Sequence, residues 1–515
     1  MNFGLGSPST ERTTTIELSP LARGILVTLL VMASISIGTV VDLTILVAAL
    51  GLFNVAVVLF LLLKKDITWG FLFYLTAVIF FQTGFWIRLP GFPDLYPARI
   101  ASMLLFLVFM IQLLLGMRRA PKLGPIEKTM IIFLVIMVIS ILTSGQRKWL
   151  MLMRGYLYPF IFYYFARTVV RSSSQMRIVF SYLALVGIYF AVMGIFEKMH
   201  WYHLVWPQFI VDPNLRDHGL MRLGFRVRGI FLQPAVLGCV MTMGFFPAWH
   251  YLSRVRGILP VLVRMLLLVT TPATLFFTQT RSVYLGFAIT LIIAAGWSRK
   301  LRPWAIGMTL GAMLAVFLNW DNLSGEDRDK GGLATMNTVH YRVVLLYETA
   351  ELFLDNPLFG AGFMNFQEAA MQYRKPRDVP FFGHIDLGVG GVAISHNILV
   401  TIIAEQGLSG IIPYMLIFIL IFRRSVQIYH KLPRDGMISR DYVVCVWCAI
   451  AAYFSNAMFL ELRYFEYINV LFFFIVGAMF GLDDAIAEGE ADILEDPPAP
   501  VHTPMRRFAP VGRTS

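Results

Sequence analysis

The sequence predicts an all-α polytopic membrane protein with about 12–14 transmembrane helices. Of its 515 residues, 57% are apolar and only 14% are charged, a composition typical of integral membrane proteins. The apolar residues also form uninterrupted runs that are long enough to cross about 30 Å of hydrocarbon as a helix. A transmembrane β-barrel would instead show alternating segments of about ten residues, so we expect the chain to be helical throughout.

Charged and Pro/Gly-rich breaks divide the apolar sequence into about fourteen predicted spans. Residues 24–481 form the predicted transmembrane domain, which follows a cytoplasmic N-terminal segment at 1–23. Residues 482–515 are acidic, then Pro-rich, then basic, which predicts a disordered cytoplasmic tail. The predicted spans are 24–41, 43–63, 67–86, 99–117, 126–143, 152–170, 177–196, 234–251, 257–277, 281–297, 303–319, 396–422, 441–459 and 465–481.

Lysine and arginine concentrate in alternate loops, which predicts the orientation of the spans. By the positive-inside rule these loops are cytoplasmic, so both termini are expected in the cytoplasm. The anchors largely account for the net charge of +12, which therefore gives no reason to expect nucleic acid as a partner. They are Lys64, Lys65, Arg118, Arg119, Lys122, Arg167, Arg171, Arg177, Arg254, Arg256, Arg299, Lys300, Arg302, Arg423, Arg424, Lys431 and Arg434.

Two long polar loops, residues 197–233 and 320–395, fall on the opposite, extracytoplasmic face. The smaller loop mixes Trp, Tyr and Phe with His and Arg, which favours a pair of interfacial helices at the level of the lipid headgroups. The larger loop contains YRVVLLYETAELFLDNPLFG, where helical spacing followed by Asp-Asn-Pro predicts a surface helix that stops at the proline. We expect extracytoplasmic chemistry in these two loops.

The sequence predicts neither a metal ion nor a cofactor. The acidic residues of DNLSGEDRDKGG lack the ligand spacing of a calcium loop, and the chain contains no GxxxxGK[ST] stretch for nucleotide phosphates. Cys239, Cys445 and Cys448 all lie within predicted spans. Their sulfurs are therefore expected to pack in the core, even though the last two have CxxC spacing.

Arginines collect on the outer face, where the positive-inside rule predicts few. Arg226 and Arg228 precede the span at 234–251, Arg281 begins another span, and Arg342 lies in the large loop. The guanidinium group stays ionised and offers a planar fork to phosphate or carboxylate oxygens, so this set suits an anionic headgroup. Each arginine taken singly could instead be a snorkelling anchor at the end of a span.

His396 opens the span at 396–422 at its outer end, with Ser395 before it as a candidate N-cap. An imidazole with an ordinary pKa of about 6.5 can accept a proton from a hydroxyl group. His396 is therefore a candidate general base, although a single histidine could equally be a hydrogen-bonded residue of the interface.

Glu405 follows His396 by nine residues within the same apolar run. On a straight helix it would lie about 13 Å deeper and half a turn away, so the two side chains are not expected to share a site. Glu405 is instead expected to bond a neighbouring helix. Gly407 and Gly410 lie nearer the face of the histidine, where small residues permit close approach of another helix.

Four stretches, in one order and on one predicted face, resemble segments of the O-antigen ligase and polymerase superfamily. HNILVTIIAEQGLSG is similar to the family signature of His-Asn, an apolar helix and an E-x-G-x-x-G-like end. RVRGIFLQPAVLG, TQTRSVYLG and YRVVLLYETAELFLDNPLFGAGFMNF resemble its R-x-x-G-x-x-x-x-P, T-x-S-R-x-x-x-L and R...pl-G-x-G-x-x-F segments. The resemblance covers about residues 225–415. Ala235, Thr280 and Val400 depart mildly from the family pattern, and none of the three changes removes an ionisable group.

The resemblance implies a GT-C-like membrane glycosyltransferase that acts without a metal ion at the periplasmic face of the bacterial inner membrane. Its donor would be a glycan on undecaprenyl diphosphate, and its acceptor would be lipid A core or a growing glycan. His396 would take the proton of the acceptor hydroxyl, and Arg226, Arg228, Arg281 and Arg342 would neutralise the diphosphate. The residues with an implied structural role are Asn397, Glu405, Gly407 and Gly410.

Two activities within this family stay open, namely ligation of a glycan onto lipid A core and polymerisation of repeat units into O-antigen or exopolysaccharide. A transporter or flippase of lipid-linked sugars is the alternative from another class, because it also predicts many spans and arginines. A transporter is expected to contain paired repeats with helices broken near the midplane of the membrane, and the sequence shows no convincing pair.

Overall fold

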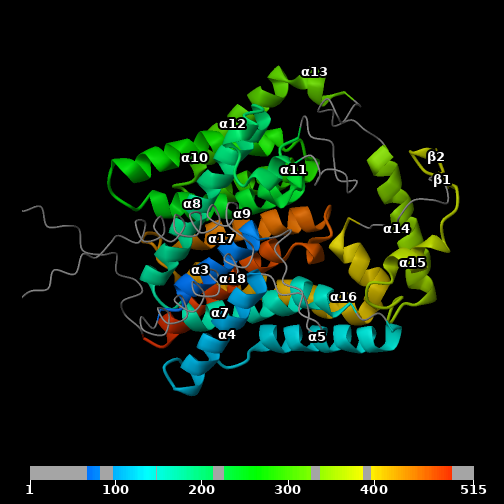
Figure 1. Ribbon diagram of the computed structural model, residues 1–515, viewed down its shortest axis with the longest axis horizontal. Helices are drawn as coiled ribbons and strands as arrows, with labels where there is room; N and C mark the ends of the chain where they lie inside the picture. The colour runs from blue at the N-terminus through cyan, green and yellow to red at the C-terminus, as the bar shows by residue number, and fades with distance from the viewer. Residues whose placement is uncertain are drawn as a thin grey trace, which may run out of the picture.

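The computed structural model describes residues 66–81, 97–145, 148–212, 226–325, 337–386 and 396–489. Over these residues the protein is a helical bundle in which seven helices are long and apolar enough to cross a membrane (Figure 1). The expected all-α, multi-pass membrane fold is confirmed. The predicted spans at 24–41 and 43–63, the N-terminal segment and most of the tail lie outside the described residues.

Each predicted span from 67–86 onward contains a helix. The seven long apolar helices are α4 (Pro97–Leu114), α5 (Pro125–Ser144), α8 (Ser173–Lys198), α9 (Pro234–Leu252), α10 (Ile258–Phe277), α16 (Ile398–Lys431) and α18 (Glu466–Ala487). Between and beside them lie α3 (Thr68–Phe80), α11 (Arg281–Trp297), α12 (Arg302–Leu318) and α17 (Arg440–Ala457). The weakest predicted span, 152–170, is divided among α6 (Trp149–Leu152), the π-helical η1 (Met153–Leu157) and α7 (Tyr158–Val169).

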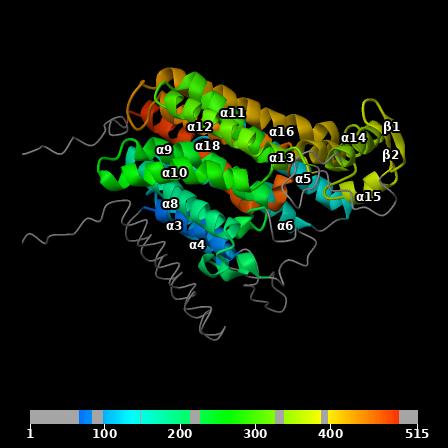
Figure 2. The same cartoon turned by 90° about the horizontal axis from the view of Figure 1, so that it is seen from above.

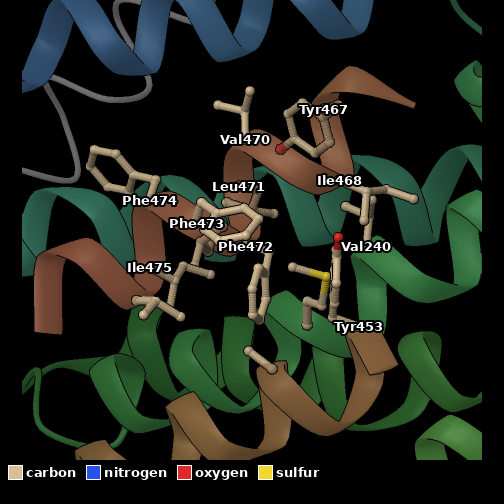
Figure 3. Close-up of a cluster of buried hydrophobic side chains, with 14 of the residues drawn as sticks. Val240, Tyr453, Tyr467, Ile468, Val470, Leu471, Phe472, Phe473, Phe474 and Ile475 are labelled. Carbon is tan, nitrogen blue, oxygen red and sulfur yellow. The ribbon is translucent and has the colours of Figure 1, made fainter. Parts of the chain in front are cut away.

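Helices α9 and α18 form the centre of the bundle, since they are the most buried of the seven long helices. Gly477 and Gly481 of α18, one turn apart, let its backbone approach α7. A Cβ atom at Gly477 would lie 2.2 Å from the carbonyl oxygen of Tyr163, so small residues set this contact. Figure 3 shows the adjoining aromatic cluster, where the ring of Phe472 of α18 stacks on that of Tyr453 of α17 at 4.0 Å between centroids.

Ion pairs tie the predicted cytoplasmic loops together at one end of the bundle. Arg167 of α7 contacts Glu127 of α5 at 2.5 Å and Asp484 of α18 at 2.6 Å. Arg424 of α16 contacts the same Asp484 at 2.5 Å. The loop after α9 joins the same end through Arg254, whose guanidinium lies 3.8 Å from Asp441 of α17. We call this the basic end.

The predicted start of the tail at residue 482 is wrong by six residues, nearly two helical turns. Helix α18 continues to Ala487 because its last turn is part of the basic end. Asp483 pairs with Arg424 at 3.0 Å, and Asp484 is shared between Arg424 and Arg167. Carboxylates that looked like the beginning of an acidic tail are therefore structural partners of the transmembrane helices.

The larger loop forms a small cap beyond the first turns of α16 (Figures 1 and 2). The cap consists of α14 (Asn337–Asp355), α15 (Phe366–Met371) and an antiparallel hairpin of β1 (Arg377–Val379) and β2 (Gly383–Ile385), in which Arg377 pairs with Ile385. The short α13 (Trp320–Leu323), at the start of the same loop, lies beside α12 (Figure 1). Helix α14 ends at Asp355, directly before Asn356 and Pro357. The helix and its stop before Pro357 were thus predicted correctly.

The smaller loop differs from the expected pair of interfacial helices. Its described part contains only the 3-10 turns η2 (Tyr202–Leu204), η3 (Gln208–Val211) and η5 (Gly229–Phe231). Pro207 precedes η3 and cannot supply a helical N–H, and Gly229 has a φ of +55°, outside the right-handed helical region. The loop is also bonded to α8, since the hydroxyl of Tyr189 donates to the carbonyl oxygen of Trp206 at 2.7 Å.

Candidate active site

Several helices have one terminus in the basic end and the other terminus at the opposite side of the bundle. Helices α9 and α11 begin there, α10 and α17 end there, and α16 starts there beneath the cap (Figures 1 and 2). The candidate residues of the sequence lie at these helix ends or in the cap. They are therefore gathered at the end of the bundle opposite the predicted cytoplasmic anchors.

Arg226 and Arg281 meet at the connection between α10 and α11. The guanidinium of Arg226 donates to the carbonyl oxygen of Thr278 at 3.1 Å and to the hydroxyl of Thr280 at 2.7 Å. Thr280 is the N-cap position of α11, and Arg281 is the first helical residue. Both guanidinium groups thus belong to the N-terminal end of α11, where the helix dipole adds further positive potential.

The end of α17 links this connection to the cap. Gly286, in the second turn of α11, lies so close to α17 that a Cβ atom there would be 3.3 Å from Ser455 and Asn456. A few residues later, the carbonyl oxygen of Phe459 accepts a hydrogen bond of 3.3 Å from Arg342 of α14, whose guanidinium also lies 5.0 Å from the centre of the Phe459 ring. This series of contacts brings Arg342 to the same end of the bundle as Arg226 and Arg281.

His396 lies directly before α16, in the field of Arg342. Burial lowers the pKa of its imidazole below the usual value, and the positive charge of Arg342 lowers this pKa further. The histidine is therefore neutral at pH 7 and can accept a proton. His396 is only partly buried.

The first turn of α16 is capped by Asn397, where the sequence suggested Ser395. The Oδ1 atom of Asn397 accepts hydrogen bonds from the backbone N–H groups of Leu399 at 2.9 Å and Val400 at 3.2 Å. A cap at Asn397 places His396 just outside the helix, with a positive φ of 48°. Asn397 thus has a structural role in setting where the imidazole stands.

Residues 265–415 match the family model described as O-antigen ligase. This part of the chain is similar to O-antigen ligases, and we call residues 265–415 the ligase domain after that match. It includes Arg281, Arg342 and His396, whereas Arg226 and Arg228 precede it. The match indicates an enzyme of the ligase or glycosyltransferase type. No curated protein matches the chain.

Helix α16 of the ligase domain is broken at Gly407, so the expected straight helix is wrong. Gly407 has φ 59° and ψ −149°, a conformation open essentially to glycine alone. A Cβ atom at this position would lie 2.5 Å from the carbonyl oxygen of Pro357. The close neighbour of Gly407 is therefore the turn that follows α14, where the sequence suggested a second helix. At Gly410 the crowding comes from the same helix, since an added Cβ atom would lie 2.2 Å from the Cβ of Gln406.

The turn at 357–362 fills the break with backbone hydrogen bonds. Ala361 and Gly362 donate to the carbonyl oxygens of Ala404 and Glu405 at 2.9 and 2.8 Å. On the other side of the break, Leu408 donates to Pro357 at 2.8 Å and Ser409 donates to Leu358 at 3.0 Å. These bonds satisfy polar groups that the interrupted helix leaves unpaired, which buried backbone requires. The break is therefore a built feature of the ligase domain.

Glu405 binds Arg463, a residue that the sequence reasoning missed. The two guanidinium–carboxylate contacts measure 2.6 and 2.9 Å, and both side chains are buried. Arg463 lies in the 3-10 turn η7 (Leu462–Tyr464), between α17 and α18, and so in the connection between two helices. The signal for it was available, because Glu461 and Arg463 are charged residues in a short connection between two apolar runs on the outer face.

Arg228 has a different environment from the other three arginines. Its side chain is 3% exposed, its Nε lies 3.7 Å from Glu197 of α8, and an Nη donates to the carbonyl oxygen of Ile210 at 3.0 Å. Glu197 also accepts from the backbone N–H groups of Arg228 and Gly229. Arg228 therefore holds the smaller loop against α8, and we remove it from the set expected to bind diphosphate directly.

Proposed function

We propose that the protein transfers a glycan from an undecaprenyl-diphosphate carrier to a hydroxyl group of a sugar acceptor, at the periplasmic face of the bacterial inner membrane. The observation that carries the proposal is that His396, directly before α16, lies within the electrostatic influence of Arg342 of α14, at the end of the bundle opposite the predicted cytoplasmic anchors. A base and a cation, next to an arginine-bearing helix terminus, suit the displacement of an anionic leaving group.

In the proposed reaction, the acceptor oxygen attacks the anomeric carbon of the donor sugar. The bond from that carbon to the diphosphate oxygen breaks, and its electron pair leaves with the carrier. His396 takes the proton of the acceptor hydroxyl as the new bond forms. The imidazolium returns its proton to solvent after the product leaves.

Arg226, Arg281 and Arg342 are proposed to stabilise the negative charge that develops on the diphosphate. Cations that are already in place at the transition state are effective because the site need not reorganise. Arg226 is held by two hydrogen bonds to the α10–α11 connection, and Arg281 begins α11. With three cations in place, the proposed reaction does not depend on a metal ion, and we expect it to survive chelation by EDTA.

The broken α16 is also a feature of transporters, in which irregular backbone lines a substrate path. In this protein the break is filled by a turn of the same ligase domain through four backbone hydrogen bonds. Transporter breaks are expected to line a cavity and to recur in a second repeat. A turn that closes the break favours a fixed catalytic scaffold, although transport of lipid-linked sugars stays the alternative.

The test uses purified protein and undecaprenyl-diphosphate glycan, with lipid A core supplied as acceptor in one reaction and repeat units in another. A glycan joined to lipid A core identifies a ligase, and a lengthened glycan identifies a polymerase. His396→Ala is expected to lower the rate by about 10²- to 10⁴-fold while donor binding persists. Movement of the donor across proteoliposomes without a glycosidic product would replace the proposal by the transporter alternative.

A further inference from the structure

We infer that Arg463 is a positioning residue that holds the short first half of α16, and with it His396, in the orientation that the reaction needs. The inference rests on the proposed function for its chemistry, and on contacts among Arg463, Glu405, Glu461 and Thr401 for its geometry. Arg463 itself lies in η7, outside the matched ligase segment.

The first half of α16 is divided from the second by non-helical backbone at Gly407. Residues 398–406 precede the non-helical Gly407, and the long apolar segment up to Lys431 follows it. The axis of the short half, which begins next to His396, is therefore not fixed by a continuous helix with the second half. The backbone bonds from the turn at 357–362 hold the lower end of the short half, so another contact must fix its upper turns.

Two side chains on one face of the short half supply that contact. Thr401 and Glu405 are four residues apart and so lie one above the other on the helix. The hydroxyl of Thr401 donates to Glu461, and Glu405 accepts both hydrogen bonds from Arg463. Arg463 also lies 3.3 Å from Glu461. The short half is thus held at two successive turns by one rigid unit, which we call the Arg463 clamp.

The clamp is itself fixed to the bundle. A Cβ atom at Gly155 of η1 would lie 2.8 Å from the Cβ of Arg463, so the arginine is pressed against the backbone of η1. Its guanidinium lies 5.6 Å from the centre of the ring of Phe363. Phe363 follows the glycine turn that fills the break. Contacts with η1 therefore fix Arg463, and Arg463 in turn fixes the short half of α16, which begins next to His396.

The charges in the clamp predict which replacement matters most. Two buried carboxylates, Glu405 at 2% and Glu461 at 4% exposed, share the single guanidinium of Arg463. Glu405→Gln leaves one carboxylate with one guanidinium and can still accept a hydrogen bond, so its effect should be mild. Loss of the arginine charge would leave two buried carboxylates uncompensated, which is strongly unfavourable. Arg463→Lys avoids that problem because it keeps the charge and removes only the two-point geometry.

The first test compares Arg463→Lys with Arg154→Lys. Arg154 of η1 pairs with Glu466 of α18 at 3.6 Å, so it is an arginine–carboxylate contact between η1 and α18 in the same region. Arg463→Lys should lower kcat by about 10- to 100-fold, since displacement of a catalytic group by about 1 Å has effects of that size. KM for the donor and the kcat of Arg154→Lys should both stay within about two-fold of wild type. Unchanged kcat in folded Arg463→Lys would overturn the inference.

A second measurement needs no glycan transfer, so it separates an error in the clamp from an error in the proposed function. The rate at which diethyl pyrocarbonate modifies His396, followed by mass spectrometry across pH, reports the fraction of neutral imidazole. In Arg463→Lys the midpoint should shift upward from wild type, because a displaced imidazole is less buried and further from Arg342. Coincident profiles would mean that the arginine has only a structural role.

If Arg463→Lys does not fold, Thr401→Val provides an independent test of the Arg463 clamp. It removes the hydroxyl that bonds Glu461 but leaves the shape and every charge of the clamp in place. We expect a loss of about 3- to 10-fold in kcat, corresponding to one hydrogen bond, with donor KM unchanged. Wild-type kcat and an unaltered modification profile of His396 in this variant would contradict the clamp.

Discussion

His396 combines an uncommon backbone conformation with a perturbed side chain. Its φ of 48° lies in the left-handed region, which costs a residue with a β-carbon about 1–2 kcal/mol. The two hydrogen bonds that Asn397 accepts at the helix start help to offset this cost. The imidazole meanwhile has a lowered pKa, first through burial and then through Arg342. Strain and a shifted pKa at one residue are both signs of a functional site.

The pH dependence of glycan transfer should report the lowered pKa of His396. The base is competent when neutral, so kcat/KM should be constant above the lowered pKa and should fall as pH drops through it, at a midpoint below about 6.5. Arg342→Gln removes one of the two causes and should move this midpoint upward, while burial, the larger cause, keeps it below the ordinary value. A midpoint that is the same in wild type and Arg342→Gln would show that Arg342 does not act on His396.

Arg281 should be sensitive to replacement by lysine. Arg281→Lys keeps the charge but loses the planar fork that binds two phosphate oxygens at once, so we expect a loss of about 10-fold or more in kcat/KM. Arg299→Lys is the matched control, because Arg299 is exposed in the basic end. Product formation at equal protein yield measures both variants, and equal activity would remove Arg281 from the site.

At the scale of elements, α16 shows how a membrane helix can carry a fixed catalytic end. The break at Gly407 and the turn at 357–362 require glycine at three positions. Gly360, Gly362 and Gly407 all have positive φ, and a Cβ atom at Gly360 would lie 2.4 Å from the carbonyl carbon of Glu405. The backbone of the turn fits closely against that of α16. This contact explains why glycine is needed both in the turn and in the helix, although the two segments are far apart in the sequence.

Gly407→Ala should therefore destabilise the ligase domain. The alanine would be forced into backbone angles that cost about 1–3 kcal/mol and would also meet the carbonyl oxygen of Pro357. We expect a lower unfolding temperature in detergent and lower activity. Gly307→Ala in α12 is the control, since nothing lies within 4 Å of a Cβ atom there and alanine favours a helix. Equal unfolding temperatures in the two variants would argue that α16 can straighten without cost.

At the scale of the whole molecule, charge separates the two ends of the bundle. The basic end binds together the loops that carry most of the predicted cytoplasmic anchors, through acidic partners such as Asp441, Asp483 and Asp484. The opposite end carries Arg226 and Arg281 at the start of α11, His396 directly before α16, and Arg342 in α14 of the cap. The basic end is the better candidate for the cytoplasmic side, because lysines and arginines are enriched there.

Cysteine labelling in intact cells tests this orientation. Cysteines substituted at 281 and 396 should react with a membrane-impermeant maleimide from the periplasm, whereas one at 299 should react only after the inner membrane is opened. The native Cys239, Cys445 and Cys448 are buried and should give little background. Labelling of 281 and 396 from the cytoplasmic side alone would reverse the proposed orientation.

The sequence by itself determined what depends on local composition and spacing. Apolar runs placed the helices from α3 to α12 and from α16 to α18, Asp-Asn-Pro ended α14, and the His-Asn and arginine segments indicated the residues of the proposed site. The same spacing also suggested that Glu405 would not share a site with His396, and Glu405 is bonded to Arg463. Each of these features follows from hydrophobicity, helix periodicity or a stop signal within a few residues.

Only the tertiary structure decided the features that join distant residues. The break in α16 depends on the turn at 357–362, the pairing of Arg228 depends on Glu197, and α18 extends to Ala487 because Asp484 meets Arg167 and Arg424. In each case a buried polar group needs a partner, and the identity of that partner is set by which helices lie side by side. The local sequence shows that a charge or a glycine is present in an apolar run, but the packing of the helices determines which residue it contacts.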